Sequence, residues 1–180
     1  MEPPSKLLKQ SYRRLIGNDI VDLAVAAQQS NWKRKGYLHK IFSEEEQLLI
    51  LSTDKPDVMV WLLWSMKESA YKIYSRKKNS RTFAPTQLCC QDINFSTPIC
   101  TGKVLMEGLI YFTESTINDE MIHTICASSK EEIEKIKVEI SIPEDPLKMN
   151  YRHKNPQCVS HHGAYLALVY INPDSLLSIS

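Results

Sequence analysis

The stretch Trp64-Ser65-Met66-Lys67-Glu68-Ser69-Ala70-Tyr71-Lys72 lies inside a run, Asp57 to Ser75, that contains no Gly or Pro. We therefore expect one long helix there, because nothing in the run interrupts helical hydrogen bonding. Glu68 and Lys72 are four residues apart, so they share a face of this helix, one turn from the bulky Trp64. A Glu-Lys pair at this spacing is also common on solvated helix faces. The stretch alone leaves two interpretations open: a surface ion pair, or a functional carboxylate beside an ammonium group.

A second segment, Ile16-Gly17-Asn18-Asp19-Ile20-Val21-Asp22-Leu23, mixes β-branched apolar residues with two carboxylates. It predicts a strand over Leu15 to Leu23 whose end carries polar groups. Side chains three residues apart on a strand point to opposite faces, so only one of Asp19 and Asp22 is expected to face a given site. A solvent-edge aspartate beside a turn glycine is the alternative interpretation.

The third segment, Val159-Ser160-His161-His162-Gly163-Ala164-Tyr165, predicts a polar turn that leads into a last strand over Tyr165 to Ile171. Two histidines could bind a metal ion, but neighbouring side chains diverge and the sequence offers no further ligands at zinc spacing. We therefore do not expect a zinc site here.

The first half of the chain is predicted to be mainly helical. From Ser30 onward apolar residues recur at helical intervals and basic residues fill the other positions, which predicts a basic amphipathic helix. The apolar positions are Trp32, Tyr37, Leu38 and Ile41, and the basic ones are Lys33, Arg34, Lys35, His39 and Lys40. Ser43, followed three residues later by Glu46, is typical of a capping box and predicts a short helix through Leu51.

The second half is predicted to form strands, because Gly and Pro punctuate the sequence at short intervals from Thr86 onward. The expected strands cover 87–95, 103–112, 121–127 and 136–142, with a short helix over 130–135 and a charged, Pro-rich loop over 143–156. Helices followed by strands predict an α+β fold, an antiparallel sheet packed against the long helix with shorter helices beside it. At 180 residues the chain suits one domain, 1–180, with 1–14 as a tail or arm.

The composition excludes several functional classes. A net charge of +1 gives no strong positive field for nucleic acid or an anionic membrane. The sequence contains no run of about 18 apolar residues and no signal-peptide pattern, so we expect a cytoplasmic protein. The five cysteines are odd in number and include an adjacent pair, which predicts reduced, mostly buried thiols.

Taken together, these segments resemble the 4'-phosphopantetheinyl transferase superfamily, in particular its single-repeat branch, the holo acyl-carrier-protein synthases. The resemblance rests on segments that occur in the family's order: Gly17 to Leu23, Tyr37 to Glu46, Trp64 to Lys72, and Ser160 and His161 with Tyr165 and Ala167. The Lys-Glu helix is the most specific of these, whereas the Gly-x-Asp strand is informative only in its company.

The resemblance implies Mg²⁺-dependent transfer of the 4'-phosphopantetheine group of coenzyme A to a serine, with release of adenosine 3',5'-bisphosphate. It assigns Asp19 and Glu68 as Mg²⁺ ligands, and carboxylate oxygens are what this ion prefers. Lys72 would contact the coenzyme A phosphates, and Glu68 is also the candidate general base. His161 would contact the nucleotide part of the coenzyme or else hold a structural turn. Lys67 is a further candidate for coenzyme binding, and the alternatives are that it supports the carboxylates or faces solvent.

The resemblance also implies partners. The acceptor would be an apo acyl or peptidyl carrier protein, as in fatty-acid biosynthesis. Such carriers are acidic, so Lys33 to Lys35, with Lys40, would either steer the carrier or form a solvated helix face. A single set of motifs implies a homo-oligomer, commonly a trimer in that branch, and neither nucleic acid nor membrane is an expected partner.

Two positions depart from the family pattern. Val25 and Leu63 stand where the synthases carry basic residues. The resemblance implies that the residue at Val25 would contact the carrier protein, and this contact is missing here. Both departures favour an alternative function, a non-catalytic coenzyme-A-binding or assembly subunit of the same fold.

Overall fold

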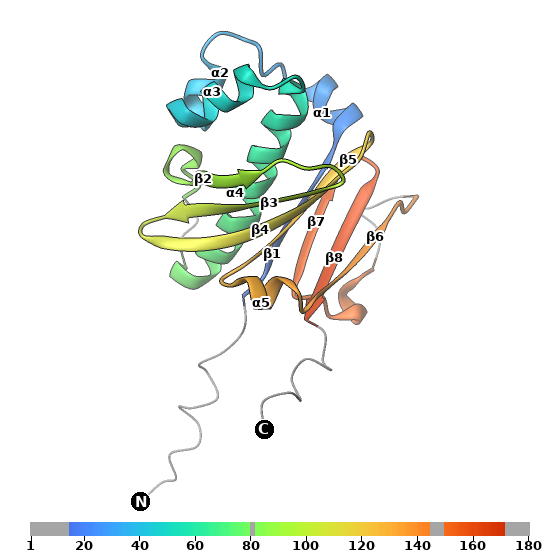
Figure 1. Cartoon of the computed structure of the whole chain (residues 1–180). Helices are drawn as coiled ribbons and strands as arrows, with labels where there is room; N and C mark the ends of the chain where they lie inside the picture. The colour runs from blue at the N-terminus through green and yellow to red at the C-terminus, as the bar shows by residue number, and fades with distance from the viewer. Residues whose placement is uncertain (1–14, 80–81, 145–149, 172–180) are drawn as a thin grey trace, which may run out of the picture.

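The computed structural model describes residues 15–79, 82–144 and 150–171. A five-stranded antiparallel sheet has the order β1-β5-β4-β3-β2, and a three-stranded antiparallel sheet has the order β6-β8-β7 (Figure 1). Helix α4 (Pro56–Lys78) packs across the five-stranded sheet, and the shorter helices α1, α2 and α3 gather beyond one end of it. The predicted α+β fold, with a long helix against an antiparallel sheet, is confirmed.

The remaining elements have the following bounds. The strands are β1 (Gly17–Asp22), β2 (Cys89–Asn94), β3 (Ile99–Met106), β4 (Leu109–Ile117), β5 (Met121–Ala127), β6 (Ile136–Ser141), β7 (Cys158–His162) and β8 (Tyr165–Ile171). The helices are α1 (Leu23–Gln29), α2 (Tyr37–Ile41), α3 (Glu44–Ser52) and α5 (Lys130–Ile133), with 3-10 turns η2 (Pro85–Gln87) and η3 (Arg152–Lys154).

Helix α4 has a start signal at its N-terminus and a stop signal at its C-terminus. Pro56 occupies its first turn, where a missing backbone N–H costs nothing, and Asn79 ends it in the left-handed conformation. Asp57 lies in the first turn and three basic residues lie in the last, which complements the helix dipole. The predicted helix, Asp57 to Ser75, is confirmed and extends to Lys78.

Strand β1 is buried along its whole length and lies against α4. A Cβ atom at Gly17 would lie 2.0 Å from the backbone oxygen of Ser69 in α4, so only glycine permits this approach. The predicted strand over Leu15 to Leu23 is confirmed, although it ends at Asp22, which caps α1 by accepting a hydrogen bond from Val25 N. Helix α1 was not expected.

The helix predicted from Ser30 onward is wrong over residues 30–36 and right only over α2. Asn31 Oδ1 accepts a hydrogen bond from Lys33 N, a local turn that competes with helical bonding. Gly36 adopts a φ of 79°, which a helix cannot contain. The capping box of α3 is confirmed, because Ser43 Oγ accepts from Glu46 N while Glu46 Oε2 accepts from Ser43 N.

The strand predicted over 103–112 is wrong, because it runs through a hairpin turn. Glu107 and Gly108 both have positive φ, as two-residue hairpin turns require, and the chain reverses there between β3 and β4. The predicted strands at 87–95, 121–127, 136–142 and 165–171 correspond to β2, β5, β6 and β8. The predicted helix over 130–135 is α5, and part of the predicted loop, 145–149, lies outside the described residues.

Strand β7 was expected to be a polar turn. It pairs with β8, with Ser160 opposite Ala167 and His162 opposite Tyr165, and the turn itself contains only Gly163 and Ala164. The polar residues of this segment predicted a turn, but the segment is a strand. Its alternate side chains Ser160 and His162 are directed toward β1.

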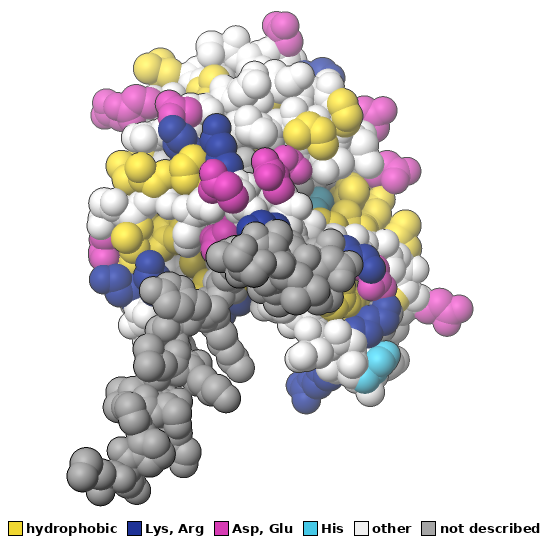
Figure 2. Space-filling view, turned by 60° about the horizontal axis from the view of Figure 1, so that its bottom comes forward, with side chains coloured by type: hydrophobic (Ala, Val, Ile, Leu, Met, Phe, Trp, Pro, Cys, Tyr) yellow, Lys and Arg dark blue, Asp and Glu magenta, His cyan; other side chains and the backbone are white. Residues whose placement is uncertain are grey.

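Acidic, basic and hydrophobic side chains are intermixed on the face shown in Figure 2. No helix among the described residues is both long enough and apolar enough to cross a membrane. All five cysteines are free thiols, with Cys100, Cys126 and Cys158 buried and the adjacent pair Cys89 and Cys90 half-buried.

Candidate active site

A cleft of about 330 Å³ lies where β1, α1, α4 and β7 meet. Three predicted site residues line it: Asp19 from β1, Glu68 from α4 and His161 from β7. The other lining residues are Ile20, Val21, Ala26, Gln29, Ser30, Tyr37, Trp61, Trp64 and His162. The fold thus brings together residues that are far apart in the sequence.

Asp19 lies on the face of β1 that is directed toward α4, the same face as Gly17. Its buried carboxylate accepts a hydrogen bond from Ser160 Oγ at 3.0 Å, and the same oxygen, Oδ1, lies 3.3 Å from Lys72 Nζ. No hydrogen bond to its other oxygen, Oδ2, is formed by the described residues. Asp22 points to the other face of β1 and bonds to Val25 N and Ala164 N instead.

Glu68 is half-buried and makes no hydrogen bond or ion pair within the described part of the chain. Burial, together with the negative charge of Asp19, raises the pKa of Glu68 to about 7, although the Lys72 ammonium opposes this rise. Two carboxylates that repel each other in one cleft form a site that a cation would stabilise.

Lys72, one turn beyond Glu68, directs its ammonium group across the junction between the two sheets. Its three acceptors are Asn18 O at 2.7 Å, Ser160 Oγ at 3.1 Å and Asp19 Oδ1 at 3.3 Å. An ammonium group has three N–H donors, so all of them are satisfied here. A phosphate contact by Lys72 would have to replace one of these bonds.

His161 is exposed, whereas His162 is half-buried. The Nδ1 atom of His162 accepts a hydrogen bond from Asp22 N at 2.9 Å, which gives this side chain a structural partner. His161 is therefore the more available of the two for a bound molecule.

A comparison with protein families identifies the superfamily of the chain. The family model described as the 4'-phosphopantetheinyl transferase superfamily matches residues 15–126, more than half of the chain. The chain belongs to this superfamily. The match includes Asp19, Glu68 and Lys72 and ends before Ser160 and His161.

No curated protein matches the sequence. Among solved structures, the holo-[acyl-carrier-protein] synthase of Thermotoga maritima is similar, with 11% sequence identity and a TM-score of 0.45. The similarity covers 89% of this chain and 86% of that one.

In this phosphopantetheinyl transferase family member, Lys67 lies apart from the cleft. Its side chain is fully buried, and its ammonium group donates to Glu46 Oε2 at 2.7 Å, Pro85 O at 2.8 Å and Ile41 O at 2.9 Å. All three donors are satisfied within the protein, so none remains for a coenzyme. Lys67 does not face solvent, and the carboxylate that it supports is Glu46.

The donor set of the cleft is suited to a hard cation. The described residues contain no group of three or more His, Cys, Asp or Glu side chains that could hold a metal ion. The two carboxylates of Asp19 and Glu68 nevertheless fit the coordination preference of Mg²⁺. This ion commonly binds one or two protein carboxylates and completes its coordination shell with water and phosphate oxygens.

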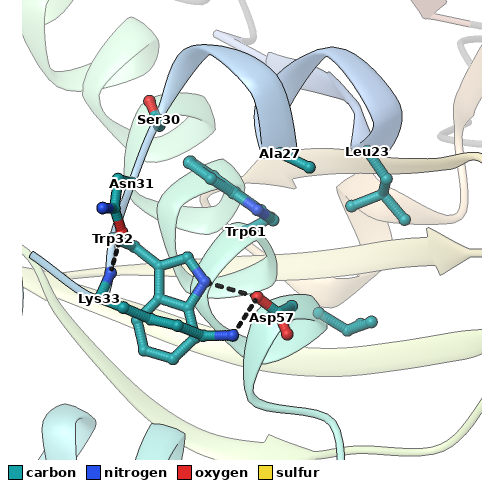
Figure 3. A pocket seen from close by; sticks show the side chains of 9 residues that line it. Leu23, Ala27, Ser30, Asn31, Trp32, Lys33, Asp57 and Trp61 are labelled. Atoms are coloured by element: carbon teal, nitrogen blue, oxygen red, sulfur yellow. Dashed lines mark hydrogen bonds and ion pairs between the residues drawn. The ribbon is translucent and has the colours of Figure 1, made fainter.

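A second cleft, of about 280 Å³, adjoins the first and shares Ser30 and Trp61 with it. Figure 3 shows Trp32 and Lys33 converging there on Asp57, with Trp32 Nε1 at 2.7 Å and Lys33 Nζ at 3.5 Å from Asp57 Oδ1. Lys33, the first residue of the basic run, is therefore partly neutralised. Arg34 lies over the Tyr37 ring, 5.3 Å from its centroid, and Lys35 is exposed.

Ser160 and Asn18 are site residues that the sequence did not predict. Ser160 bonds to both Asp19 and Lys72, and the Asn18 backbone oxygen accepts from Lys72. No sequence signal points to Ser160, because Cys158 to His162 do not alternate between apolar and polar residues and the burial alternates only in the folded strand. No pattern points to Asn18 either, because its role depends on its backbone oxygen.

Proposed function

We propose that this protein transfers the 4'-phosphopantetheine group of coenzyme A to a serine of an apo carrier protein, with Mg²⁺, and releases adenosine 3',5'-bisphosphate. One observation carries the proposal: Asp19 and Glu68 line one cleft with Lys72 beside them, in a chain of the phosphopantetheinyl transferase superfamily. We further propose that it acts as a holo acyl-carrier-protein synthase.

Asp19 and Glu68 would hold the Mg²⁺ ion. When bound, the ion would neutralise charge that develops on the diphosphate as the bond to the departing nucleotide breaks. Glu68 must be deprotonated to serve as a ligand. Because its pKa is about 7, a bound cation would displace this proton to solvent near neutral pH.

The other residues would bind and orient the coenzyme. Lys72 would exchange a protein acceptor for a phosphate oxygen, for which a flexible ammonium group is well suited. His161, exposed at the rim of the cleft, would contact the nucleotide part. We leave Lys67 out of the proposed coenzyme site, because its ammonium group is buried and fully hydrogen-bonded.

The cleft is built from one set of motifs, so we propose that a second copy of the chain completes the coenzyme site in a homo-oligomer, with a trimer as the expected form. Sedimentation equilibrium measures this directly. A monomer that transfers the group at full rate would contradict it. We also propose that the protein acts in the cytoplasm.

A non-catalytic coenzyme-A-binding or assembly subunit is the second candidate function. Val25 and Leu63 favour it, because they lack the charge that the family pattern places there. Leu63 belongs to α4 and its side chain is fully buried in the core, so a charged side chain at this position could not reach solvent without rearrangement.

The mass of the carrier tests the two candidates. The protein is incubated with coenzyme A, Mg²⁺ and each of several apo carrier proteins, and every carrier is then weighed by mass spectrometry. We expect one carrier to gain the mass of the arm, and a chelator or the substitution Glu68→Ala to abolish the gain. Glu44→Gln, which removes an exposed carboxylate on α3, is the matched control and should leave the gain intact. Binding of coenzyme A without modification of any carrier would favour the non-catalytic function.

A further inference from the structure

We infer that Ser160 is a positioning residue whose hydroxyl group fixes the Asp19 carboxylate for the cation. The inference rests on the proposed function and extends its site to a residue of the three-stranded sheet, beyond the part of the chain that the family match covers.

Strands β1 and β7 lie side by side in separate sheets (Figure 1). One edge of β1 pairs with β5, while the other edge meets side chains of β7 in place of strand carbonyls. Ile20 N donates to Ser160 Oγ at 3.2 Å, and Asp22 N donates to His162 Nδ1 at 2.9 Å. Ser160 is thereby held at a fixed position along β1, beside Asp19.

The direction of each hydrogen bond at Ser160 follows from its partners. A hydroxyl group has one donor and two acceptor positions. Ile20 N and Lys72 Nζ can only donate, and they fill both acceptor positions at 3.2 and 3.1 Å. The single O–H donor is therefore directed at Asp19 Oδ1, 3.0 Å away. Ser160 is only 6% exposed, so water does not compete for this proton.

This arrangement fixes the Asp19 carboxylate through one oxygen. Oδ1 takes the hydrogen bonds from Ser160 and Lys72, which leaves Oδ2 without a partner among the described residues. Without the hydroxyl, Lys72 alone would hold the carboxylate, and its ammonium group would lose one of its own three acceptors. Removal of a partner that orients a metal ligand typically weakens metal affinity about 10- to 100-fold.

Titration calorimetry with Mg²⁺, in the presence of coenzyme A at pH 8, tests the inference without measuring turnover. We expect Ser160→Ala to raise the Kd for Mg²⁺ about 10- to 100-fold. Because loss of the acceptor for Ile20 N could prevent folding, Ser160→Cys serves as a second variant. Its thiol is close in size but is a weak donor and acceptor, so it should also raise the Kd, by about 10-fold.

Ser115→Ala is the matched control. Ser115 is a buried serine on β4, two strands away from Asp19, and its hydroxyl bonds to Thr124 Oγ1 at 2.8 Å. Its loss should leave the Kd unchanged. Mg²⁺ affinity that is unaltered in both Ser160 variants would overturn this inference alone. Absence of Mg²⁺ binding by the unsubstituted chain would overturn the proposed function as well.

Discussion

Glu68 lies half-buried in a cleft that also contains the negative charge of Asp19, and no described residue donates a hydrogen bond to it. Such an arrangement disfavours the ionised form in the absence of a cation. Because the pKa of Glu68 is raised in the folded chain, the folded state binds this proton more tightly than the unfolded state does. Stability is therefore lost as pH rises from the usual Glu pKa of 4.5 toward about 7, and the loss is complete above that value.

Glu68→Gln should consequently stabilise the metal-free protein at high pH. A shift of the pKa from 4.5 to about 7 corresponds to at most about 3 kcal/mol at pH 8, reduced by solvent screening of this half-buried group. At pH 5 the gain should be under about 1 kcal/mol, because the folded chain still keeps the proton and pH 5 lies only slightly above the unfolded-state pKa of 4.5. Urea unfolding at both pH values measures this, with Glu44→Gln as the control. A variant that is less stable than the unsubstituted chain at pH 8 would contradict the assigned environment of Glu68.

The sequence predicted residue positions better than residue roles. Asp19, Glu68 and His161 were predicted to share a site, and they line one cleft. Lys67 adjoins Glu68 in the sequence, so the sequence alone places both at the site. In the structure Glu68 lines the cleft, whereas the side chain of Lys67 is directed into the core. The ammonium group of Lys67 donates to Glu46 and to two backbone oxygens, from segments that lie near Lys67 only in the tertiary structure.

At the scale of elements, the buried pair of Lys67 and Glu46 joins the short helices α2 and α3 to α4. Besides Lys67, the Glu46 carboxylate accepts from Ser43 N at 2.8 Å and from Cys90 N at 2.7 Å. Lys67 in turn reaches the end of α2 and the turn η2. The pair therefore fixes α2, α3, η2 and β2 against the helix that carries Glu68.

Lys67→Met should cost about 3–5 kcal/mol of unfolding free energy, because it leaves the Glu46 charge buried and unpaired. The double substitution Lys67→Met with Glu46→Gln should cost less than Lys67→Met alone, since no unpaired charge remains. Lys33→Met, at an exposed ion pair with Asp57, is the control and should cost under about 1 kcal/mol. Chemical unfolding of the three variants provides the measurement. A double variant with full stability but without coenzyme A binding would show that Lys67 has the coenzyme role that its environment argues against.

Element boundaries were predicted where local signals are strong and were missed where the signal depends on tertiary context. The capping box at Ser43 and the uninterrupted run of α4 are local, and both were predicted. The hairpin at Glu107 and Gly108 was missed because apolar runs flank it on both sides, 104–106 and 109–112, so that two strands were interpreted as one. Strand β7 was missed because its polar side chains are satisfied by β1, a partner about 140 residues away.

At the scale of the whole molecule, the basic run that would steer an acidic carrier protein lies next to the cleft. The basic run, residues 33–35, follows α1, and the adjoining cleft shares Trp61 with the candidate site. Lys33 is paired with Asp57, so Arg34 and Lys35 supply most of the free positive charge of this run. A net charge of +1 over the whole chain makes any electrostatic steering local.

Replacing Arg34 and Lys35 with Glu should raise the KM for the carrier protein about 10-fold and leave the KM for coenzyme A unchanged. Higher salt should weaken carrier recognition by the unsubstituted chain more than by this variant, because screening acts on the same charges. Steady-state kinetics at two salt concentrations measures both effects. The double substitution Lys130→Glu with Lys137→Glu, at exposed lysines on α5 and β6, changes the net charge by the same amount and is the control. An equal loss in that control would show that the effect does not depend on position.

The most direct test of the proposed chemistry is the position of a bound cation. Crystals grown with coenzyme A and Mn²⁺ in place of Mg²⁺ would locate the ion by its anomalous scattering. We predict a single peak within coordinating distance of one carboxylate oxygen of Asp19 and one of Glu68. A peak elsewhere, or two carboxylates that remain too far apart to share the ion, would contradict the proposed site.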